Sequence, residues 1–258
     1  MTLHAAFAAG VRLVDTADAY CLSAADTGHN ELLVSEAIAG WDGPRSEIVI
    51  ATKGGHVRDS GGGWGTDGRP EHLVRAALAS RERLGVDAIP LYYFHRPDPA
   101  VSFVRSVGAL AMLLADGVVR SVGLSNVGTQ QLESAMEVVP VAAVQNSFSP
   151  YDASSRGVLA WCDAHGVPFV AWAPLGGAGR AATLGSDQQT RIHAEVARSR
   201  SVSVAQVVLA WILSRSPVVS VVPGARRPAS IIDAVAADSL VLTSAETDRL
   251  NDQFDTLP

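Results

Sequence analysis

Residues 91–126, LYYFHRPDPAVSFVRSVGALAMLLADGVVRSVGLSN, decide the fold class of this chain. Residues 91–95 and 121–126 are short apolar runs without alternation, which predicts strands buried on both faces of a parallel sheet. Residues 99–115, which lie between these two runs, carry apolar side chains at helical spacing and predict a helix. A strand, a helix and a second strand in this order are the repeating unit of parallel α/β proteins.

The same unit recurs along the whole sequence of 258 residues. We predict strands at 12–16, 48–53, 91–95, 121–126, 142–146, 169–174 and 218–223. Helices are predicted at 30–39, 70–84, 99–115, 129–138, 154–165 and 203–214, with another after Pro228. No Gly-x-Gly-x-x-Gly follows an early strand, so a TIM-type (β/α) barrel is favoured over a doubly wound sheet. We expect residues 1–258 to form a single (β/α)-barrel domain.

The start of the chain does not fit a complete barrel. A closed barrel of this type needs eight strands, whereas residues 4–9 followed by Gly10 have the pattern of a helix end. A first strand is therefore missing from the pattern. A late start of the sequence, a strand supplied by a partner chain, or a degenerate seven-stranded barrel would each explain the gap, and we expect the first.

Composition and charge narrow the functional classes. The formal net charge of -6 argues against a nucleic-acid-binding surface. No apolar run approaches the roughly 18 residues of a membrane span, and the N-terminus lacks a basic start and a cleavage motif. Cys21 and Cys162 have no spacing typical of disulfide frameworks or metal sites. We expect a soluble cytoplasmic protein without metal, nucleic-acid or membrane partners.

Polar residues follow three consecutive predicted strands. Asp15 and Tyr20 follow the first strand, Lys53 ends the second and His95 ends the third. The carboxyl ends of barrel strands carry the active site, so these side chains are candidates for proton transfer. A lysine ammonium would lower the pKa of a neighbouring phenol, an aspartate would keep the lysine charged, and a histidine would orient a substrate oxygen.

Each of these residues has an alternative interpretation. Asp15 could cap a turn, Lys53 could be a solvated loop residue, and Tyr20 and His95 could belong to the core. Their coincidence at successive strand ends favours catalysis. Lys53 could also act as a Schiff-base nucleophile, although a nearby Asp15 would raise the lysine pKa and argues against this chemistry.

Several motifs resemble those of the aldo-keto reductase family. The matching segments are 14–20 (VDTADAY), 51–53 (ATK), 92–97 (YYFHRP), 122–126 (VGLSN), 144–146 (VQN), 172–176 (WAPLG) and 222–227 (VPGARR). They span almost the whole chain. The resemblance implies an oxidoreductase that reduces an aldehyde or ketone, with the catalytic tetrad Asp15, Tyr20, Lys53 and His95 and with Tyr20 as proton donor.

The resemblance also implies an NADPH site. Ser125, Asn126 and Gln145 match positions that bind the nicotinamide carboxamide, and Trp172 matches the ring that stacks on the nicotinamide. The other matched residues are Pro174, Leu175 and Gly176 beside the pyrophosphate, and Gly224, Arg226 and Arg227 at the 2'-phosphate. Arginine suits a phosphate monoester. Ser230 and Ala234 depart from the family pattern, which leaves NADH possible. The family's N-terminal hairpin and first strand are both missing.

The glycine-rich segment 54–69 predicts a mobile lid, in which Trp64 is expected to contact a small-molecule carbonyl substrate. A second hypothesis follows from the missing first strand. In it, the chain is a catalytically impaired barrel of the same family that acts as a binding or regulatory subunit.

Overall fold

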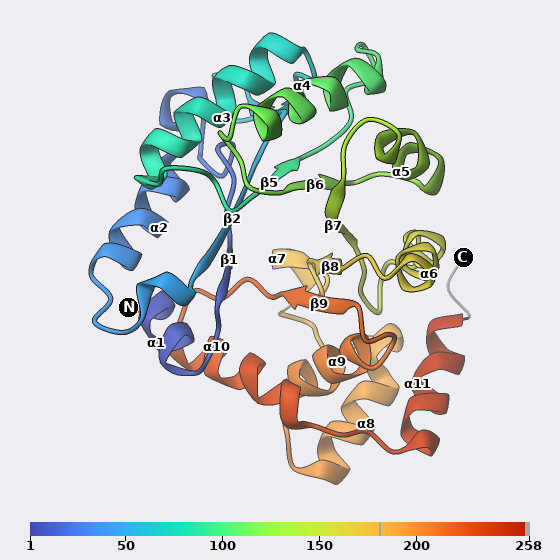
Figure 1. The fold of residues 1–258 in the computed structure, drawn as a ribbon. Helices are drawn as coiled ribbons and strands as arrows, with labels where there is room; N and C mark the ends of the chain where they lie inside the picture. Colours follow the sequence, from blue (N-terminus) through green and yellow to red (C-terminus); the bar gives the residue numbers. More distant parts are fainter. Residues whose placement is uncertain (181, 256–258) are drawn as a thin grey trace. The chain divides into compact units, whose positions relative to one another are not determined.

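The computed structural model describes residues 1–180 and 182–255 and divides the chain into two compact units (Figure 1). The first unit is Gly10–Val144. The second unit combines Met1–Ala9 with Gln145–Pro258. The two units are described separately below.

Parallel strands form the centre of the first unit. They are β1 (Leu13–Asp15), β2 (Val49–Gly54), β5 (Leu91–Phe94) and β6 (Val122–Ser125), which follow one another in this order in the sheet. The register places Lys53 opposite Tyr93 and Tyr93 opposite Gly123. In this order and direction, the carboxyl ends of successive strands, where the predicted catalytic residues lie, share one edge of the sheet.

Helices alternate with these strands as the sequence predicts. They are α2 (His29–Ala39), α3 (Pro70–Leu84), α4 (Phe103–Ala115) and α5 (Thr129–Met136), with 3-10 turns at Ala24–Asp26 and Arg45–Glu47. Figure 1 shows α2, α3 and α4 side by side along the outer face of the strands. Pro70 begins α3, and Gly85 ends it in the left-handed conformation (φ 64°), as expected for a proline start and a glycine end.

The predicted helix at 99–115 begins later than expected, at Phe103. The Asp98 carboxylate accepts hydrogen bonds from the backbone N–H groups of Gly68 and Ala100, at 2.9 Å each. These bonds hold the backbone after His95 in a turn, so Pro99 lies outside the helix. The proline signal was therefore correct for α3 and wrong for α4.

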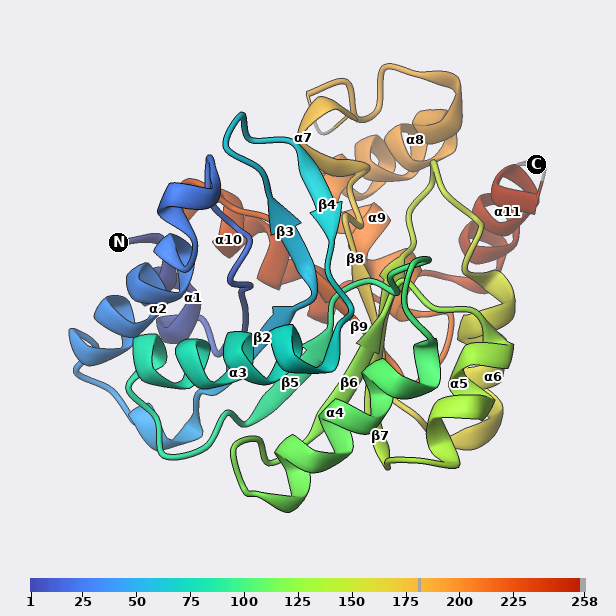
Figure 2. The same cartoon turned by 90° about the horizontal axis from the view of Figure 1, so that it is seen from above.

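A β-hairpin occupies most of segment 54–69, where the sequence analysis expected a mobile lid. Its strands are β3 (His56–Arg58) and β4 (Trp64–Thr66), which pair antiparallel and project from the carboxyl end of β2 (Figure 2). Asp59 accepts hydrogen bonds from the N–H groups of Gly61 and Gly63, both at 2.8 Å. The glycines that suggested a lid thus form the tight turn of the hairpin.

The second unit contains two paired parallel strands, β8 (Phe169–Trp172) and β9 (Val219–Val222), and most of its chain is helical. Its helices are α1 (Thr2–Ala8), α6 (Arg156–His165), α7 (Gly177–Arg180), α8 (Arg191–Arg200), α9 (Val204–Leu213), α10 (Pro228–Val235) and α11 (Ser244–Asp255), with 3-10 turns at Gln188–Thr190 and Ala236–Ser239. Strand β7 (Val141–Ser147) crosses the boundary between the units. Helix α1 packs against α10 and buries Ala6 and Phe7.

All seven predicted strands are present, whereas α8 lies in a region where no helix was predicted. Among the described residues, no single helix combines the length and apolar composition needed to cross a membrane. Two pairs of helices, bent by 109° and 117° at their breaks, reach that composition only when each pair is taken together.

Candidate active site

Lys53 is the centre of the candidate site in the first unit. It is the penultimate residue of β2, and its side chain is completely inaccessible to solvent. Its Nζ lies 2.5 Å from Asp15 Oδ2, 2.9 Å from the Thr16 carbonyl oxygen and 3.1 Å from the Tyr20 hydroxyl. The ammonium group therefore joins a carboxylate to a phenol, and each contact uses one of its three N–H donors.

Tyr20 lies in the loop after β1, and 36% of its surface is exposed. Two backbone hydrogen bonds hold this loop: Asp18 N–H donates to the Lys53 carbonyl at 3.3 Å, and Gly28 N–H donates to the Asp18 carbonyl at 2.7 Å. The Tyr20 ring lies edge-on to the His95 ring, with centroids 5.6 Å apart. The structure thus brings the four residues of the predicted tetrad together.

Burial and charge act against each other on Lys53 and Tyr20. Burial lowers the pKa of Lys53, but Asp15 and Tyr20 outweigh this effect and raise the pKa above its ordinary value. A lysine that stays charged is a poor Schiff-base nucleophile, so this environment disfavours the aldolase-like alternative.

For Tyr20, burial raises the pKa, and the opposing effect of Lys53 only reduces that rise. The sequence predicted that Lys53 would bring the pKa of Tyr20 below its ordinary value, and that prediction was wrong. The pKa is raised instead because of desolvation, which a linear sequence does not reveal. Lys53 still acts in the predicted direction, because it stabilises the phenolate.

His95 lies at the end of β5 and is only 6% exposed. Burial, Lys53, His56 and Arg96 lower its pKa to about 2, so the imidazole is neutral at physiological pH. Among the described residues, its Nδ1 has no hydrogen-bond partner. A neutral ring can donate one N–H to a substrate oxygen without adding a charge to the site.

Asn126 supports His95 from the next strand. Its Nδ2 donates to the His95 carbonyl oxygen at 2.9 Å and to Ser125 Oγ at 3.0 Å. Asn126 adopts a left-handed conformation (φ 60°), which asparagine tolerates better than most residues. The sequence motifs assign Asn126 to the cofactor alone and give no sign of its contact with His95.

A buried carboxylate behind Lys53 was also missed. Glu31 on α2 is inaccessible to solvent, accepts a hydrogen bond from Thr52 Oγ1 at 2.5 Å and forms an ion pair with Arg83 of α3 at 2.6 Å. Because Thr52 precedes Lys53, this network holds the end of β2 to both helices. The polar spacing of α2 gives no signal that distinguishes Glu31 from a solvated glutamate.

Aromatic contacts extend from the candidate site into the β3–β4 hairpin. The His56 ring lies 4.9 Å from the His95 ring, and the Trp64 ring stacks on His56 at 4.3 Å. The Arg58 guanidinium lies 3.4 Å above the Trp64 ring. Trp64, predicted to contact substrate, is 49% exposed and is connected to the tetrad through His56.

The residues predicted to bind the cofactor are divided between the units. Ser125 and Asn126 lie at the end of β6 in the first unit. The second unit contains the others, which are Gln145, Trp172, Pro174, Leu175, Gly176, Gly224, Arg226 and Arg227.

Within the second unit, several of these residues have features that suit a ligand. Trp172 ends β8, and its Nε1 is buried without a partner among the described residues. Gly176 adopts φ 82°, and its N–H donates to the Ala173 carbonyl at 2.8 Å. Arg226 and Arg227 are exposed just before α10, and their guanidinium groups form no ion pair with the described residues.

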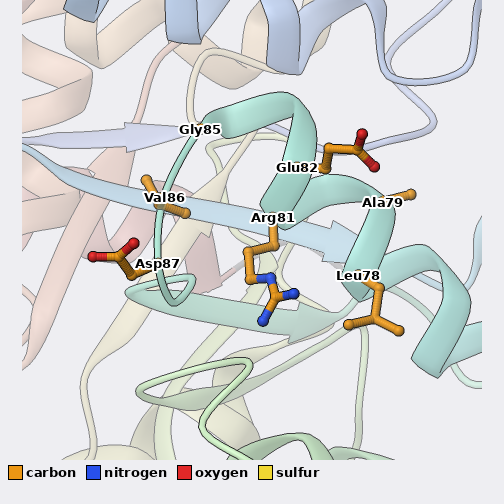
Figure 3. Close-up of a pocket in the computed structure, with 7 residues that line it drawn as sticks. All are labelled: Leu78, Ala79, Arg81, Glu82, Gly85, Val86 and Asp87. Atoms are coloured by element: carbon orange, nitrogen blue, oxygen red, sulfur yellow. The ribbon is translucent and has the colours of Figure 1, made fainter.

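A separate open pocket lies on the first unit, along the C-terminal half of α3 and the loop that follows it (Figure 3). Its lining residues are Leu78, Ala79, Arg81, Glu82, Gly85, Val86 and Asp87. None of them belongs to the predicted site, and the pocket contains no histidine, tyrosine or lysine. We therefore place the candidate chemistry at the tetrad and not in this pocket.

Comparisons with known proteins agree with the motifs. The profile of the Aldo/keto reductase family matches residues 1–253. An oxidoreductase of Schizosaccharomyces pombe is 32% identical over 94% of this chain and 74% of its own length. The aldo-keto reductase str7 of Strobilurus tenacellus is 31% identical over 95% of this chain and 77% of its own.

Solved structures show the same similarity. A thermostable aldo-keto reductase in complex with the inhibitor epalrestat has a TM-score of 0.81 at 27% identity and covers 97% of this chain and 85% of its own. The aldo/keto reductase from Klebsiella pneumoniae, solved with NADP and acetate, has a TM-score of 0.79 at 27% identity over 98% of this chain and 83% of its own. The chain therefore belongs to the aldo/keto reductase family, a family of NAD(P)H-dependent oxidoreductases with a (β/α)-barrel fold.

Proposed function

We propose that this protein reduces an aldehyde or ketone to an alcohol with NADPH, and that Tyr20 donates the proton. One observation carries the proposal. The buried Lys53 ammonium lies 3.1 Å from the Tyr20 hydroxyl and 2.5 Å from Asp15, beside a neutral His95. This set can deliver a proton to an oxygen that becomes negatively charged.

The residues of the second unit fit a phosphorylated dinucleotide. The Arg226 and Arg227 guanidinium groups beside the start of α10 form no ion pair with the residues that the structure describes, and they suit a phosphate monoester. Trp172 offers a ring together with a buried N–H that has no partner in the described ranges of the chain. Pro174, Leu175, Gly176 and Gly224 would lie along the cofactor, and Ser125, Asn126 and Gln145 would bind the carboxamide. Bound NADPH would supply the hydride.

The protein residues then control the proton. A substrate carbonyl oxygen accepts hydrogen bonds from the Tyr20 hydroxyl and from one N–H of neutral His95. As negative charge develops on that oxygen, the phenol transfers its proton, and the Lys53 ammonium stabilises the phenolate that remains. Asp15 keeps Lys53 charged and in place. The burial of Tyr20 keeps the phenol protonated until the reaction demands the proton.

The test is Tyr20→Phe, which removes the hydroxyl and keeps the ring. We expect turnover of an aldehyde such as 4-nitrobenzaldehyde to fall by about 100-fold or more, the contribution typical of a general acid, while NADPH binding measured by tryptophan fluorescence is retained. Tyr92→Phe is the matched control, because the Tyr92 hydroxyl is fully buried and has no partner in the described part of the chain. Turnover by Tyr20→Phe at the rate of the unaltered protein would contradict the assignment.

A further inference from the structure

We propose that the carbonyl substrate carries an anionic group, a carboxylate or a phosphate monoester, and that Arg96 and Arg58 bind this group. The inference rests on the proposed reductase function and specifies its substrate class. It starts from Arg58 and Arg96, two arginines that act on His56 beside the candidate site and that form no ion pair with an acidic side chain in residues 1–180 or 182–255.

Arg96 lies close to both histidines of the candidate site, since its charge helps to lower the pKa of His95 and of His56. It directly follows His95 at the end of β5 and is half-buried. Arg58 approaches from the hairpin, since its guanidinium stacks on Trp64, which stacks on His56, which contacts His95. A group held by these two guanidiniums would be attached to a substrate whose reacting carbon lies near His95 and Tyr20.

Both arginines have unused donors. The Arg96 side chain forms no hydrogen bond or ion pair with residues 1–180 or 182–255. Arg58 donates through Nη1 to the Gly62 carbonyl at 2.6 Å, but its Nε is buried and has no partner there. A buried guanidinium nitrogen without a partner, such as Arg58 Nε, is costly. An anionic ligand would satisfy it and would also engage the unused donors of Arg96.

Nearby carboxylates do not compensate these charges, because they are engaged elsewhere. Asp59 binds the hairpin amides of Gly61 and Gly63. Asp98 binds the amides of Gly68 and Ala100, and Asp67 pairs with Arg69. The charges of both arginines act on the site. Burial is the largest cause that lowers the pKa of His56 to about 4, and the charges of Arg96 and Arg58 lower it further.

The chemistry of the ligand follows from the donors. A guanidinium presents parallel N–H groups that match the two oxygens of a carboxylate or phosphate. The aromatic faces of Trp64 and His56 lie between Arg58 and the tetrad, which suits a flat or apolar body between the anionic group and the carbonyl. An anionic aromatic aldehyde therefore represents the proposed substrate class.

The experiment compares three aldehydes with NADPH: 4-carboxybenzaldehyde, 4-formylphenyl phosphate and the neutral methyl 4-formylbenzoate. The unaltered protein is expected to show a higher kcat/KM for at least one anionic aldehyde than for the ester. In Arg96→Gln, that ratio of kcat/KM values should fall by about tenfold or more, as expected for a lost charge-assisted hydrogen bond. Arg96→Lys keeps the charge, and its ratio of kcat/KM values should lie between that of the unaltered protein and that of Arg96→Gln. Arg120→Gln is the matched control, because Arg120 is exposed at the opposite end of the strands, before β6. In this variant the kcat/KM values for the anionic aldehydes and for the ester should stay unchanged.

A binding measurement separates this inference from the proposed function. Calorimetric titration of the protein with 4-(hydroxymethyl)benzoate, in the presence of NADPH, requires no turnover and should show affinity that is weakened about tenfold in Arg96→Gln. Binding that depends on Arg96 without any reduction of the aldehydes would refute the reductase function but support the anion site. Reduction of the ester at least as efficiently as of both anionic aldehydes, with a ratio that Arg96→Gln does not change, would overturn the anion site alone.

Discussion

Lys53 illustrates how single residues of the site depend on their surroundings. Its charge is buried, and it is retained because Asp15 lies at 2.5 Å and because the Thr16 carbonyl and the Tyr20 hydroxyl accept the other N–H groups. A buried charge with such partners is stable only while all of them remain. Lys53 is therefore committed to holding Asp15 and Tyr20, which fits a positioning and electrostatic role.

Asp18, two residues before Tyr20, is buried, as Glu31 is. Its Oδ1 has no partner among the described residues. Burial and the nearby Glu31 raise its pKa to about 7. Between pH 3.8 and about 7 the unfolded chain has lost this proton and the folded chain has kept it, so folding stability falls as pH rises through this window. Above about pH 7 the group adds no further change.

We expect Asp18→Asn, which stays neutral, to be more stable than the unaltered protein by an amount that grows from pH 4 to pH 7. The difference should reach at most about 4 kcal/mol, since each pKa unit corresponds to about 1.36 kcal/mol. Urea denaturation at pH 5, 6, 7 and 8 measures it. A difference independent of pH would show that Asp18 is ionised in the folded protein throughout this range.

At the scale of elements, the close contact between β5 and β6 depends on a glycine. Tyr93 and Gly123 are opposite each other in the register, and a Cβ at Gly123 would lie 2.4 Å from the Tyr93 ring and 3.1 Å from the Ala143 carbonyl oxygen. Tyr93 in turn packs with Ala51 and Ala143 in a buried cluster. The ends of these strands carry His95, Ser125 and Asn126, so their spacing sets the site.

Gly123→Ala is therefore expected to destabilise the protein by about 1–3 kcal/mol, the range of overpacking in a dense core. Gly108→Ala is the matched control, since Gly108 lies inside α4 with no heavy atom within 4 Å of the added Cβ. There we expect a gain of about 0.5–1 kcal/mol from helix propensity. Chemical denaturation of both variants measures the two changes in the free energy of unfolding. Equal changes for the two substitutions would contradict the packing explanation.

At the scale of the whole molecule, the predicted cofactor residues occur in both compact units, with most of them in the second. A ligand that binds only the folded chain stabilises it by mass action, by about 2.7 kcal/mol at a concentration 100 times the Kd. Cofactor binding by this protein should therefore appear as a rise in its melting temperature.

Arg226→Gln together with Arg227→Gln should remove most of the rise caused by NADPH and leave that caused by NADH, because only NADPH carries the 2'-phosphate. Scanning fluorimetry with each cofactor measures the two shifts. Arg198→Gln is the control, as Arg198 is an exposed arginine in the last turn of α8. Equal loss of both shifts in the double variant would show that the two arginines do not select the phosphate.

Much of the fold could be predicted because its signals are local. The apolar runs that became β2, β5 and β6 are buried over most of their length, and Pro70 and Gly85 bound α3 where expected. Local signals failed at Pro99, where the Asp98 carboxylate binds two backbone amides, and they did not reveal the β-hairpin within residues 54–69.

The sequence by itself determined the seven parallel strands and most of the helices between them, the family, and which residue types end the strands, because periodicity, turn residues and motifs are properties of neighbouring positions. Only the tertiary structure decided that Asn126 binds the His95 carbonyl, that Glu31 joins Thr52 to Arg83, and that Arg96 has no acidic partner within the described part of the chain. It also decided that burial outweighs Lys53 in setting the pKa of Tyr20. These properties depend on contacts between residues distant in the chain and on exclusion of water, and neither is encoded at any single position.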